Sequence, residues 1–299
     1  MPKVALIQTC VSVNKQDAIA HMETRIREAA ASGAQVMLLP ELFASPYFCQ
    51  EEDHAFFGLA EAFQGPTVLG MVTLAKALGV VIVVPFFERV AAGVYFNTAA
   101  VIDADGTLLG RYRKMHIPDD PGFYEKFYFA PGDLGYQVFE TRYGNIGVLI
   151  CWDQWYPEAA RLTALRGADI LVYPTAIGWH PDEKAQYGET QYNAWQRVQL
   201  GHAVANGVFV AAINRVGFEK NPVKDTGIEF WGRSFLAGPQ GEILAQAGER
   251  DDETLIQDLN FAQTETVRQH WPFLRDRRID SYGEITKRYI GLGISGEKQ

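Results

Sequence analysis

Residues 146–158 place the strongest constraint on how this chain can fold. Residues 146–150 form a short apolar run rich in β-branched side chains, which is typical of a buried strand. The run ends at Cys151, and a helical pattern begins near Pro157. Cys151 is therefore expected on a strand-to-helix turn, where a side chain is exposed and nearby backbone N–H groups lack partners. A thiol at such a turn is a candidate nucleophile, although a cysteine that ends an apolar strand can equally be a small core residue.

Length and composition predict one globular domain over residues 1–299. A chain of 299 residues is near the upper limit for a single hydrophobic core, and 47% of the residues are hydrophobic. The sequence contains no run of 18 apolar residues, which argues against a membrane span. The N-terminus enters a strand pattern directly and lacks a signal-peptide cleavage site, so a cytoplasmic location is expected. The net charge of −9 argues against nucleic-acid binding and is compatible with a cationic substrate.

Strand-like runs alternate with helical patterns in both halves of the chain, which predicts two packed sheets covered by helices. Strands are expected at residues 3–9, 35–39, 80–84, 94–102, 108–112, 146–150, 170–173 and 208–213, followed by hairpins over 228–259. Helices are expected at residues 14–32, 67–78 and 151–166, over about 20 residues ending near 206, and from 261 onward. Long loops at 114–135 and 175–187 are candidates for function. Residues 266–299 form a charged tail with aromatic residues, which we expect to serve in packing or oligomerisation.

Three charged residues are expected where elements end, which is where a scaffold presents chemistry. Glu41 follows the strand at 35–39, Lys114 follows the strand at 108–112, and Glu125 lies in an aromatic-rich part of the loop that begins at Lys114. Each has an ordinary alternative. Glu41 can be a solvated loop carboxylate, Lys114 part of a solvated basic face, and Glu125 the ion-pair partner of Lys126.

The tripeptides around these residues resemble those of a known family. The segments Leu39-Pro40-Glu41, Lys114-Met115-His116 and Cys151-Trp152-Asp153 occur in the order and type found in the nitrilase superfamily of carbon–nitrogen hydrolases. The resemblance covers about residues 3–260. It implies a four-layer α–β–β–α sandwich and a catalytic triad of Glu41, Lys114 and Cys151, with Glu125 as a second glutamate beside the triad. It also implies that no metal or other cofactor is needed, and that the chain forms a homo-oligomer.

Further segments resemble the branch of this family that hydrolyses N-carbamoylputrescine in polyamine biosynthesis. They are residues 46–50, 116–119, 125–129, 151–155 and 173–178. The resemblance implies a small cationic ureido substrate that is cleaved to putrescine, ammonia and carbon dioxide. We expect the aromatic side chains of Tyr47, Phe48, Trp152 and Trp179 to line a slot for its tetramethylene chain. A carboxylate is needed for the substrate's amine, and Asp119 is the first choice ahead of Asp120, Glu183 and Glu189.

The chemistry explains why these residue types are needed. A ureido carbonyl is a weak electrophile, because two nitrogens donate into it, whereas only a few per cent of a free thiol is ionised at neutral pH. Glu41 would take the proton of the Cys151 thiol and later activate water. Lys114 and the backbone N–H of Trp152 would hold the oxyanion, and Glu125 would orient Lys114 and the leaving nitrogen.

The remaining cysteines and histidines suggest no second site. Cys10 and Cys49 are expected to be incidental thiols, and the three cysteines have no metal-ligand spacing. His116 is expected to make structural hydrogen bonds, and His180 and His202 show no metal spacing.

Three alternatives to this function stay open at this point. The first is hydrolysis of another ureido or amide substrate, such as an N-carbamoyl amino acid. The second is a catalytically silent binding protein on the same fold. The third is a papain-like hydrolase that pairs Cys151 with a histidine.

Overall fold

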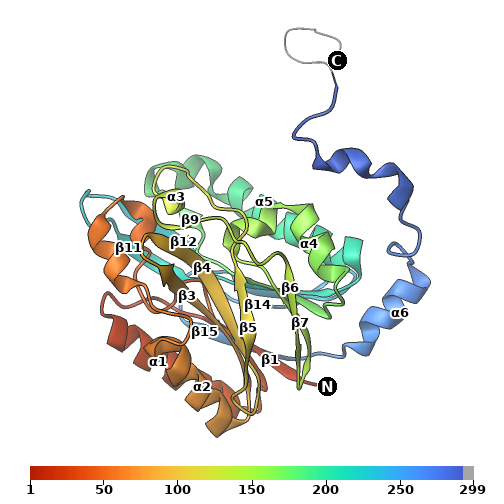
Figure 1. The fold of residues 1–299 in the computed structure, drawn as a ribbon, viewed down its shortest axis with the longest axis horizontal. Coiled ribbons are helices and arrows are strands. Elements are labelled where there is room, and N and C mark those ends of the chain that lie inside the picture. The colour runs from red at the N-terminus through yellow and green to blue at the C-terminus, as the bar shows by residue number, and fades with distance from the viewer. Residues whose placement is uncertain (292–299) are drawn as a thin grey trace.

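Two six-stranded sheets lie face to face at the centre of the computed structural model, which describes residues 1–291 (Figure 1). The first sheet contains, in spatial order, β15 (Glu253–Asp258), β1 (Lys3–Gln8), β2 (Val36–Leu38), β3 (Val81–Ala91), β4 (Val94–Ile102) and β5 (Leu108–Arg113). The second contains β14 (Ile243–Gln246), β13 (Phe235–Ala237), β10 (Phe209–Ile213), β8 (Ile170–Pro174), β7 (Gly144–Val148) and β6 (Gln137–Thr141). A small third sheet consists of β11 (Val216–Lys220), β12 (Gly227–Trp231) and β9 (Gly178–Trp179).

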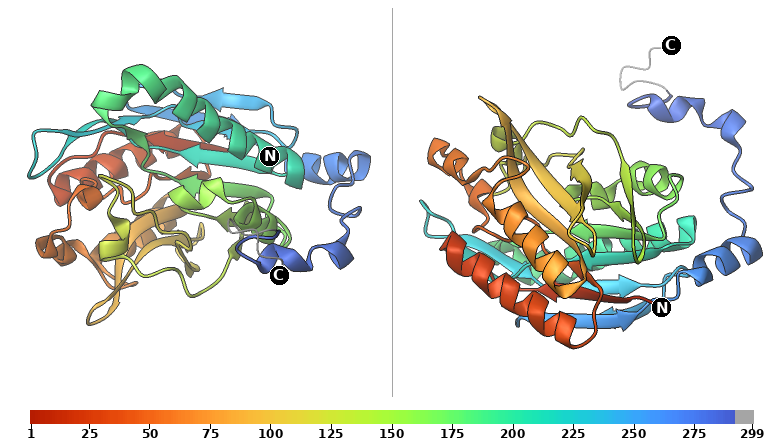
Figure 2. Two further views of the ribbon diagram at one scale, coloured as in Figure 1. Left: turned by 90° about the horizontal axis from the view of Figure 1, so that it is seen from above. Right: turned by 60° about the horizontal axis from the view of Figure 1, so that its bottom comes forward.

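Helices cover the outer faces of the two large sheets (Figure 2). The α-helices are α1 (Lys15–Ala31), α2 (Pro66–Leu78), α3 (Glu125–Tyr128), α4 (Pro157–Ala164), α5 (Pro181–Asn206) and α6 (Ala262–His270). Short 3-10 helices are η1 (Phe48–Gln50), η2 (His54–Leu59), η3 (Cys151–Trp155), η4 (Ile279–Ser281) and η5 (Gly283–Thr286). Helices α1 and α2 pack on the first sheet, whereas α4 and α5 lie over the second.

The alternation of side chains along β1 shows why the fold has four layers. Val4 and Leu6 point into the core between the two sheets. Ala5 and Ile7 point the opposite way and pack in a separate core with residues of α1 such as Ile26. A strand that is apolar on both faces requires a sheet on one side and helices on the other. The four-layer α–β–β–α sandwich expected from the sequence is thus confirmed.

The inner strands of each sheet run parallel, and this places the functional region. Strands β1, β2 and β3 are parallel to one another, as are β10, β8 and β7. Residues that follow parallel strands gather at the carboxyl edge of a sheet. Glu41 comes shortly after β2 and Cys151 shortly after β7, so each sheet delivers one of them to its own carboxyl edge.

The loop expected at residues 175–187 is wrong, because α5 begins at Pro181 and runs for 26 residues. Proline occupies the first turn of the helix, and Asp182 and Glu183 follow it there. Proline at this position and acidic side chains at the positive end of the helix dipole are ordinary start signals. Glu183 consequently lies on a helix rather than on a loop, whereas Glu189 lies on the helix as expected.

Other boundaries also differ from the expected ones. Strand β3 continues past residue 84 to Ala91 and includes Pro85, which faces Ala99 of β4. Proline is tolerated there because the pairing of β3 with β2 ends at Val83, so no neighbour on that side requires its missing N–H. Strand β6 has no counterpart in the sequence analysis, and β15 pairs with β1 instead of joining a hairpin. The helix expected over 151–166 is divided into η3 and α4.

The tail predicted over residues 266–299 lies partly outside the described residues, which end at 291. Figure 1 shows the chain after α6 running away from the body of the two sheets. Within residues 1–291, we find no helix that is long and apolar enough to cross a membrane.

Candidate functional site

Four side chains predicted from the sequence come together at the carboxyl edges of the two sheets. The Lys114 ammonium lies 2.8 Å from Glu41 Oε1 and 2.6 Å from Glu125 Oε2. Cys151 belongs to the same group, because the charges of Glu41, Lys114 and Glu125 all act on its thiol. All four side chains are buried, and none is more than 5% exposed. The structure therefore brings together all four residues proposed as catalytic.

Cys151 occupies a strained turn. It is the first residue of η3 and has a φ of +42°, in the left-handed region that a residue with a Cβ rarely adopts. Asp153 holds the turn, since its Oδ2 accepts hydrogen bonds from the Ile150 N–H at 2.9 Å and the Tyr112 hydroxyl at 2.7 Å. Its Oδ1 accepts from the His116 backbone N–H at 3.0 Å. The Asp153 carboxylate thereby stabilises the turn that carries Cys151.

The carboxylate of Glu41 is held on one oxygen and free on the other. Its Oε1 accepts from Lys114 and from the Asn97 side-chain amide at 2.7 Å. Its Oε2 is buried and has no hydrogen-bond partner among the described residues. An unpaired buried carboxylate oxygen is costly to maintain and is available to accept a proton.

A buried arginine holds the backbone around Glu41. The Arg215 guanidinium donates to the carbonyl oxygens of Glu41, Leu42 and Ser45 at distances of 2.6–3.1 Å. It also pairs with Glu219, whose other carboxylate oxygen accepts from the Tyr47 backbone N–H. Because one planar group satisfies three carbonyls, Arg215 fixes the loop that presents Glu41.

Lys114 and Glu125 complete a buried charge network. An ammonium has three N–H donors, and Glu41 and Glu125 use two of them, so one remains for a ligand. The Tyr47 hydroxyl donates to Glu125 Oε1 at 2.7 Å and orients that carboxylate. Glu125 itself opens the one-turn helix α3.

Burial and neighbouring charges set the protonation of the network. Burial and the nearby Glu41 carboxylate raise the pKa of the Cys151 thiol well above its ordinary value, and Lys114 only partly opposes them. Burial also raises the pKa of Glu125 to about 7, with Glu41 adding to the effect and Lys114 opposing it. Burial lowers the pKa of Lys114, but Glu125 and Glu41 outweigh burial and leave the pKa well above normal. The resting thiol is therefore protonated, and its ionisation requires a base.

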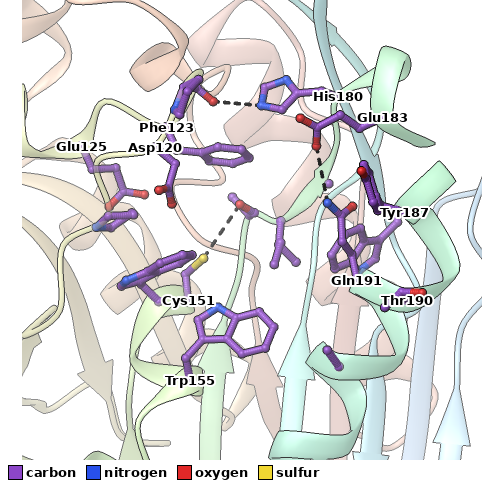
Figure 3. A pocket seen from close by; sticks show the side chains of 18 residues that line it. Asp120, Phe123, Glu125, Cys151, Trp155, His180, Glu183, Tyr187, Thr190 and Gln191 are labelled. Atoms are coloured by element: carbon purple, nitrogen blue, oxygen red, sulfur yellow. Dashed lines mark hydrogen bonds between the residues drawn. The ribbon is translucent and has the colours of Figure 1, made fainter. Parts of the chain in front are cut away.

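The thiol opens into a cavity of about 490 Å³ (Figure 3). Cys151, Trp152 and Trp155 of η3 contribute to one wall, and residues of α5 line the side across from them. The remaining lining residues are Pro118, Asp120, Pro121, Phe123, Glu125, Ala176, Ile177, Gly178, His180 and Trp231. The lining contains three carboxylates and neither lysine nor arginine. The indole N–H groups of Trp155 and Trp231 are buried and have no acceptor among the described residues, so they are available to a bound oxygen.

Of the residues expected to bind substrate, Trp152 lines the cavity and the other four do not. Tyr47 is buried behind it and contacts Glu125, whereas Phe48 packs in an aromatic cluster with Phe87. Trp179 is buried and donates its indole N–H to the Gly188 carbonyl.

The expectation for Asp119 needs correction as well. Asp119 is exposed and lies outside the lining, whereas its neighbour Asp120 is part of it. Residue type alone does not show which of two adjacent loop acids points inward.

The histidines have roles outside the charge network. His116 Nδ1 bonds Asp153 Oδ1 at 2.7 Å, and its ring stacks on Tyr156, which fits the structural role expected of it. His180 lines the cavity and bonds the Pro121 carbonyl at 2.8 Å. His202 bonds the Gln154 carbonyl at 2.9 Å.

The other two cysteines lie apart from the cavity lining. Cys10 is exposed, and partial burial of its thiol together with Asp252 raises the pKa to about 11. Cys49 is buried, and burial raises the pKa of its thiol well above the ordinary value. Both thiols are therefore protonated at neutral pH. Over residues 1–291, no group of three or more His, Cys, Asp or Glu side chains is arranged to hold a metal ion.

Sequence reasoning missed several residues that support the site. Asn97 lies in the middle of β4, where nothing distinguishes it from other polar strand residues. Arg215 follows β10 directly after Asn214, whose side chain bonds Ile177 in the loop beside the cavity. Asn214 and Arg215 follow an apolar strand, as Glu41 does, so the same sequence signal could have identified them.

Comparison with known proteins agrees with this architecture. Residues 3–269 match the carbon-nitrogen hydrolase family model. The chain is 47% identical over 282 residues to an N-carbamoylputrescine amidase from Solanum tuberosum, with 93% of each chain covered. It is 42% identical over 288 residues to a citrullinase from Francisella tularensis, covering 96% of this chain and 99% of that one. A crystal structure of a carbon-nitrogen hydrolase from Helicobacter pylori G27 superposes with a TM-score of 0.94 at 45% identity, covering 97% of this chain and 99% of that one.

Two facing sheets with a cysteine, a lysine and two glutamates buried at their strand ends define an α–β–β–α protein of the hydrolase type. The chain belongs to the carbon–nitrogen hydrolase family of the nitrilase superfamily, and it is an enzyme of the amidase type. The resemblance drawn from its three tripeptides is confirmed.

Proposed function

We propose that the protein hydrolyses N-carbamoylputrescine to putrescine, ammonia and carbon dioxide, with Cys151 as the nucleophile. The observation that supports this most strongly is the charge network of Glu41, Lys114 and Glu125 beside a buried thiol. That network opens into a cavity whose charged side chains are carboxylates. Sequence identity of 45–47% to N-carbamoylputrescine amidases from several plants supports the choice of substrate.

The first half of the reaction forms an acyl-enzyme. The free Oε2 of Glu41 accepts the Cys151 proton as the sulfur attacks the ureido carbonyl carbon. The unused N–H of Lys114 and the backbone N–H of Trp152 hold the oxygen that becomes negative, and one such donor contributes about 3–4 kcal/mol. The tetrahedral species collapses when one of its nitrogens takes the proton back from Glu41 and leaves. A carbamoyl group, or its N-alkyl form, remains on sulfur.

The second half releases the acyl group. Glu41 takes a proton from water, and the hydroxide adds to the thiocarbamate carbonyl while the same donors hold the oxyanion. The carbon–sulfur bond breaks, and the thiolate regains a proton from Glu41. The carbamate that departs decomposes to carbon dioxide and an amine or ammonia, so both nitrogens of the ureido group are released.

The cavity lining favours a cationic substrate over a ureido amino acid. A substrate carboxylate needs a fixed arginine or lysine, and the lining of this cavity contains neither. Asp120 and Glu183 line it instead. Citrulline and N-carbamoyl-β-alanine, which both carry a carboxylate, are therefore expected to be poor substrates.

The two alternatives from other classes fit the geometry less well. A papain-like mechanism needs a histidine against the thiol, whereas the Cys151 thiol donates a hydrogen bond to the Ala176 carbonyl at 3.8 Å. His116 is bound to Asp153, and His180 is bound to Pro121. A silent binding protein has no need for a strained cysteine or for a buried carboxylate oxygen that lacks a partner.

A substrate panel assayed for ammonia release tests the proposal. We expect kcat/KM for N-carbamoylputrescine to exceed that for N-carbamoyl-β-alanine and for citrulline by about 10²-fold or more. Equal values for the cationic and the carboxylate-bearing substrates would rule out this substrate and leave only the amidase class.

We also propose that the chain assembles into a homo-oligomer through the part of its tail that follows α6. Apolar side chains of Trp271, Ile279, Ile285 and Tyr289 are exposed there. An exposed apolar stretch of this kind is suited to packing on a second copy. Analytical ultracentrifugation of the protein and of the double variant Ile279→Ser and Ile285→Ser tests this. We expect the variant to sediment as a smaller assembly, and an assembly mass equal to that of the parent would contradict the proposal.

A further inference from the structure

One face of α5 runs along the cavity. The residues of this helix that line the cavity are Glu183, Tyr187, Thr190, Gln191 and Ala194. They recur every three or four residues, which places them on a single helix face. Figure 3 shows this face across the cavity from Cys151. Glu183 lies in the first turn of the helix and is the charged residue of the face.

The Glu183 carboxylate is held along this face by a neighbour. Its Oε2 accepts a hydrogen bond from Gln191 Nε2 at 3.5 Å, and both residues line the cavity (Figure 3). The bond is long and joins residues eight apart on one helix, so the exposed Glu183 side chain lies along the lining face.

The charge of Glu183 is not neutralised by the cations nearby. Lys184 pairs with Glu229 at 2.7 Å, and Arg233 pairs with Glu249 at 2.6 Å and with Glu189 at 3.2 Å. No ion pair involves Glu183 or Asp120 among the described residues, although both line the cavity. Two uncompensated carboxylates in a largely apolar cavity attract a cation.

A second observation indicates that the cavity is shaped for a ligand. Trp231 lines it and is only 2% exposed, yet its indole N–H has no acceptor among the described residues. A buried donor without a partner is costly unless a bound molecule supplies an oxygen. A ligand that satisfies both features carries an oxygen acceptor and, separate from it, a positive charge.

We propose that Glu183 is the residue that selects the substrate by binding its distal ammonium, with Asp120 contributing from the facing loop. This inference rests on the proposed function and deepens it. The ureido end lies at Cys151, the alkyl chain lies along the α5 face, and the ammonium reaches the first turn of that helix. Specificity for a cation then resides in the first turn of α5, which the sequence analysis expected to be part of a loop.

The experiment compares two substrates that differ only in charge. N-carbamoylputrescine carries the ammonium, whereas N-butylurea has the same four-carbon chain and no amine. Each substrate is assayed with the unsubstituted protein and with the variants Glu183→Gln, Asp120→Asn and Glu189→Gln. Glu189 is the matched control, because it lies on the same helix, is exposed, and is not part of the lining.

We expect Glu183→Gln to lower kcat/KM for N-carbamoylputrescine by about tenfold or more, mainly by raising KM, and to leave N-butylurea unchanged. Asp120→Asn should act in the same direction with a smaller effect, and Glu189→Gln should change neither substrate. The loss should shrink as salt is added, because screening weakens the attraction in the parent protein.

Two results would overturn the inference while the proposed function stands. One is a Glu183→Gln variant that behaves like Glu189→Gln. The other is an equal loss on both substrates, which would indicate a structural role. Failure of the unsubstituted protein to hydrolyse N-carbamoylputrescine would instead refute the proposed function itself.

Discussion

The two ends of the cavity are built in different ways. At the reacting end, Glu41, Lys114 and Glu125 are completely or almost completely buried, and each is hydrogen-bonded to another side chain. At the recognition end, Glu183 is exposed, and its carboxylate accepts one long hydrogen bond. The first region is fixed by elements of both sheets, whereas the second is the start of a helix.

This difference separates chemistry from specificity. Positioned donors and acceptors in a buried site stabilise charge far better than mobile ones in water. A recognition end on the surface can change its charge without disturbing the core. Substitutions at the reacting end should therefore lower kcat for every substrate, whereas substitutions at the recognition end should change which substrate is preferred.

The largest expected effect is the loss of the nucleophile. Cys151→Ala should lower kcat by at least about 10⁴-fold, because no other group in the cavity can form the acyl-enzyme. Steady-state ammonia release measures it. Cys49→Ala and Cys10→Ala are the controls and should keep most of the activity, since neither thiol lines the cavity. Full activity in Cys151→Ala would refute the assignment.

Replacing the base or the oxyanion donor should have the next largest effect. Glu41→Gln keeps the shape of the side chain but cannot accept a proton, and Lys114→Met removes the donor and leaves Glu41 and Glu125 facing each other. Each should lower kcat by about 10²-fold or more on cationic and neutral ureido substrates alike. A variant with normal kcat would show that the residue has been given the wrong role.

The support of Glu41 by Asn97 gives a finer test. Asn97→Leu removes the amide that holds Glu41 Oε1 while preserving the approximate volume of the side chain. We expect kcat to fall by about tenfold with little change in KM, because the base is less well oriented. Thr98→Val, at the neighbouring position in β4, is the control, since Thr98 bonds Glu88 rather than Glu41. A similar loss in both variants would point to general damage to the strand.

Glu125 should make stability depend on pH. Its pKa is about 7 in the folded protein, above the ordinary value of 4.5, chiefly because of burial. Between these two values the folded state keeps a proton that the unfolded state has released, so this group's contribution to stability falls as pH rises through that window.

Glu125→Gln removes this dependence. The Tm of the variant minus that of the parent should increase between pH 4.5 and pH 7, by the equivalent of a few kcal/mol at most. Differential scanning calorimetry across this range measures it, and a difference that stays constant with pH would contradict the assignment.

The smallest effects on stability belong to the recognition end. Glu183→Gln and Gln191→Ala remove an exposed carboxylate and a long hydrogen bond, so the free energy of unfolding should change by no more than about 0.5 kcal/mol. Arg215→Met is the contrast at the reacting end, because it leaves three carbonyls and Glu219 without their partner and should cost about 3 kcal/mol or more. Urea denaturation measures the free energy of unfolding of each variant. Equal losses of stability in Arg215→Met and in the two recognition-end variants would contradict the distinction between the two ends.

The sequence indicated which side chains come together at the reacting end because its signals are local. Glu41 and Cys151 each follow a short apolar strand, and the direction of such a strand determines which edge its last residue reaches. The partners that hold them were missed, since Asn97 and Arg215 are far from them in sequence and are identified only by contact. The acidic residues of the cavity lining were predicted least well, because the choice between Asp119 and Asp120 depends on the path of one loop. The start of α5 was misplaced although Pro181 marks it.

Rapid quenching of the reaction followed by mass spectrometry of the intact and digested protein tests the central claim most directly. With N-carbamoylputrescine, we predict one added acyl group, located on the peptide that contains Cys151 and absent from Cys151→Ala. A simple carbamoyl adduct would show that putrescine leaves first, and an aminobutyl-carbamoyl adduct would show that ammonia leaves first. Turnover with no adduct on Cys151, or with the adduct on Cys49, would contradict the account.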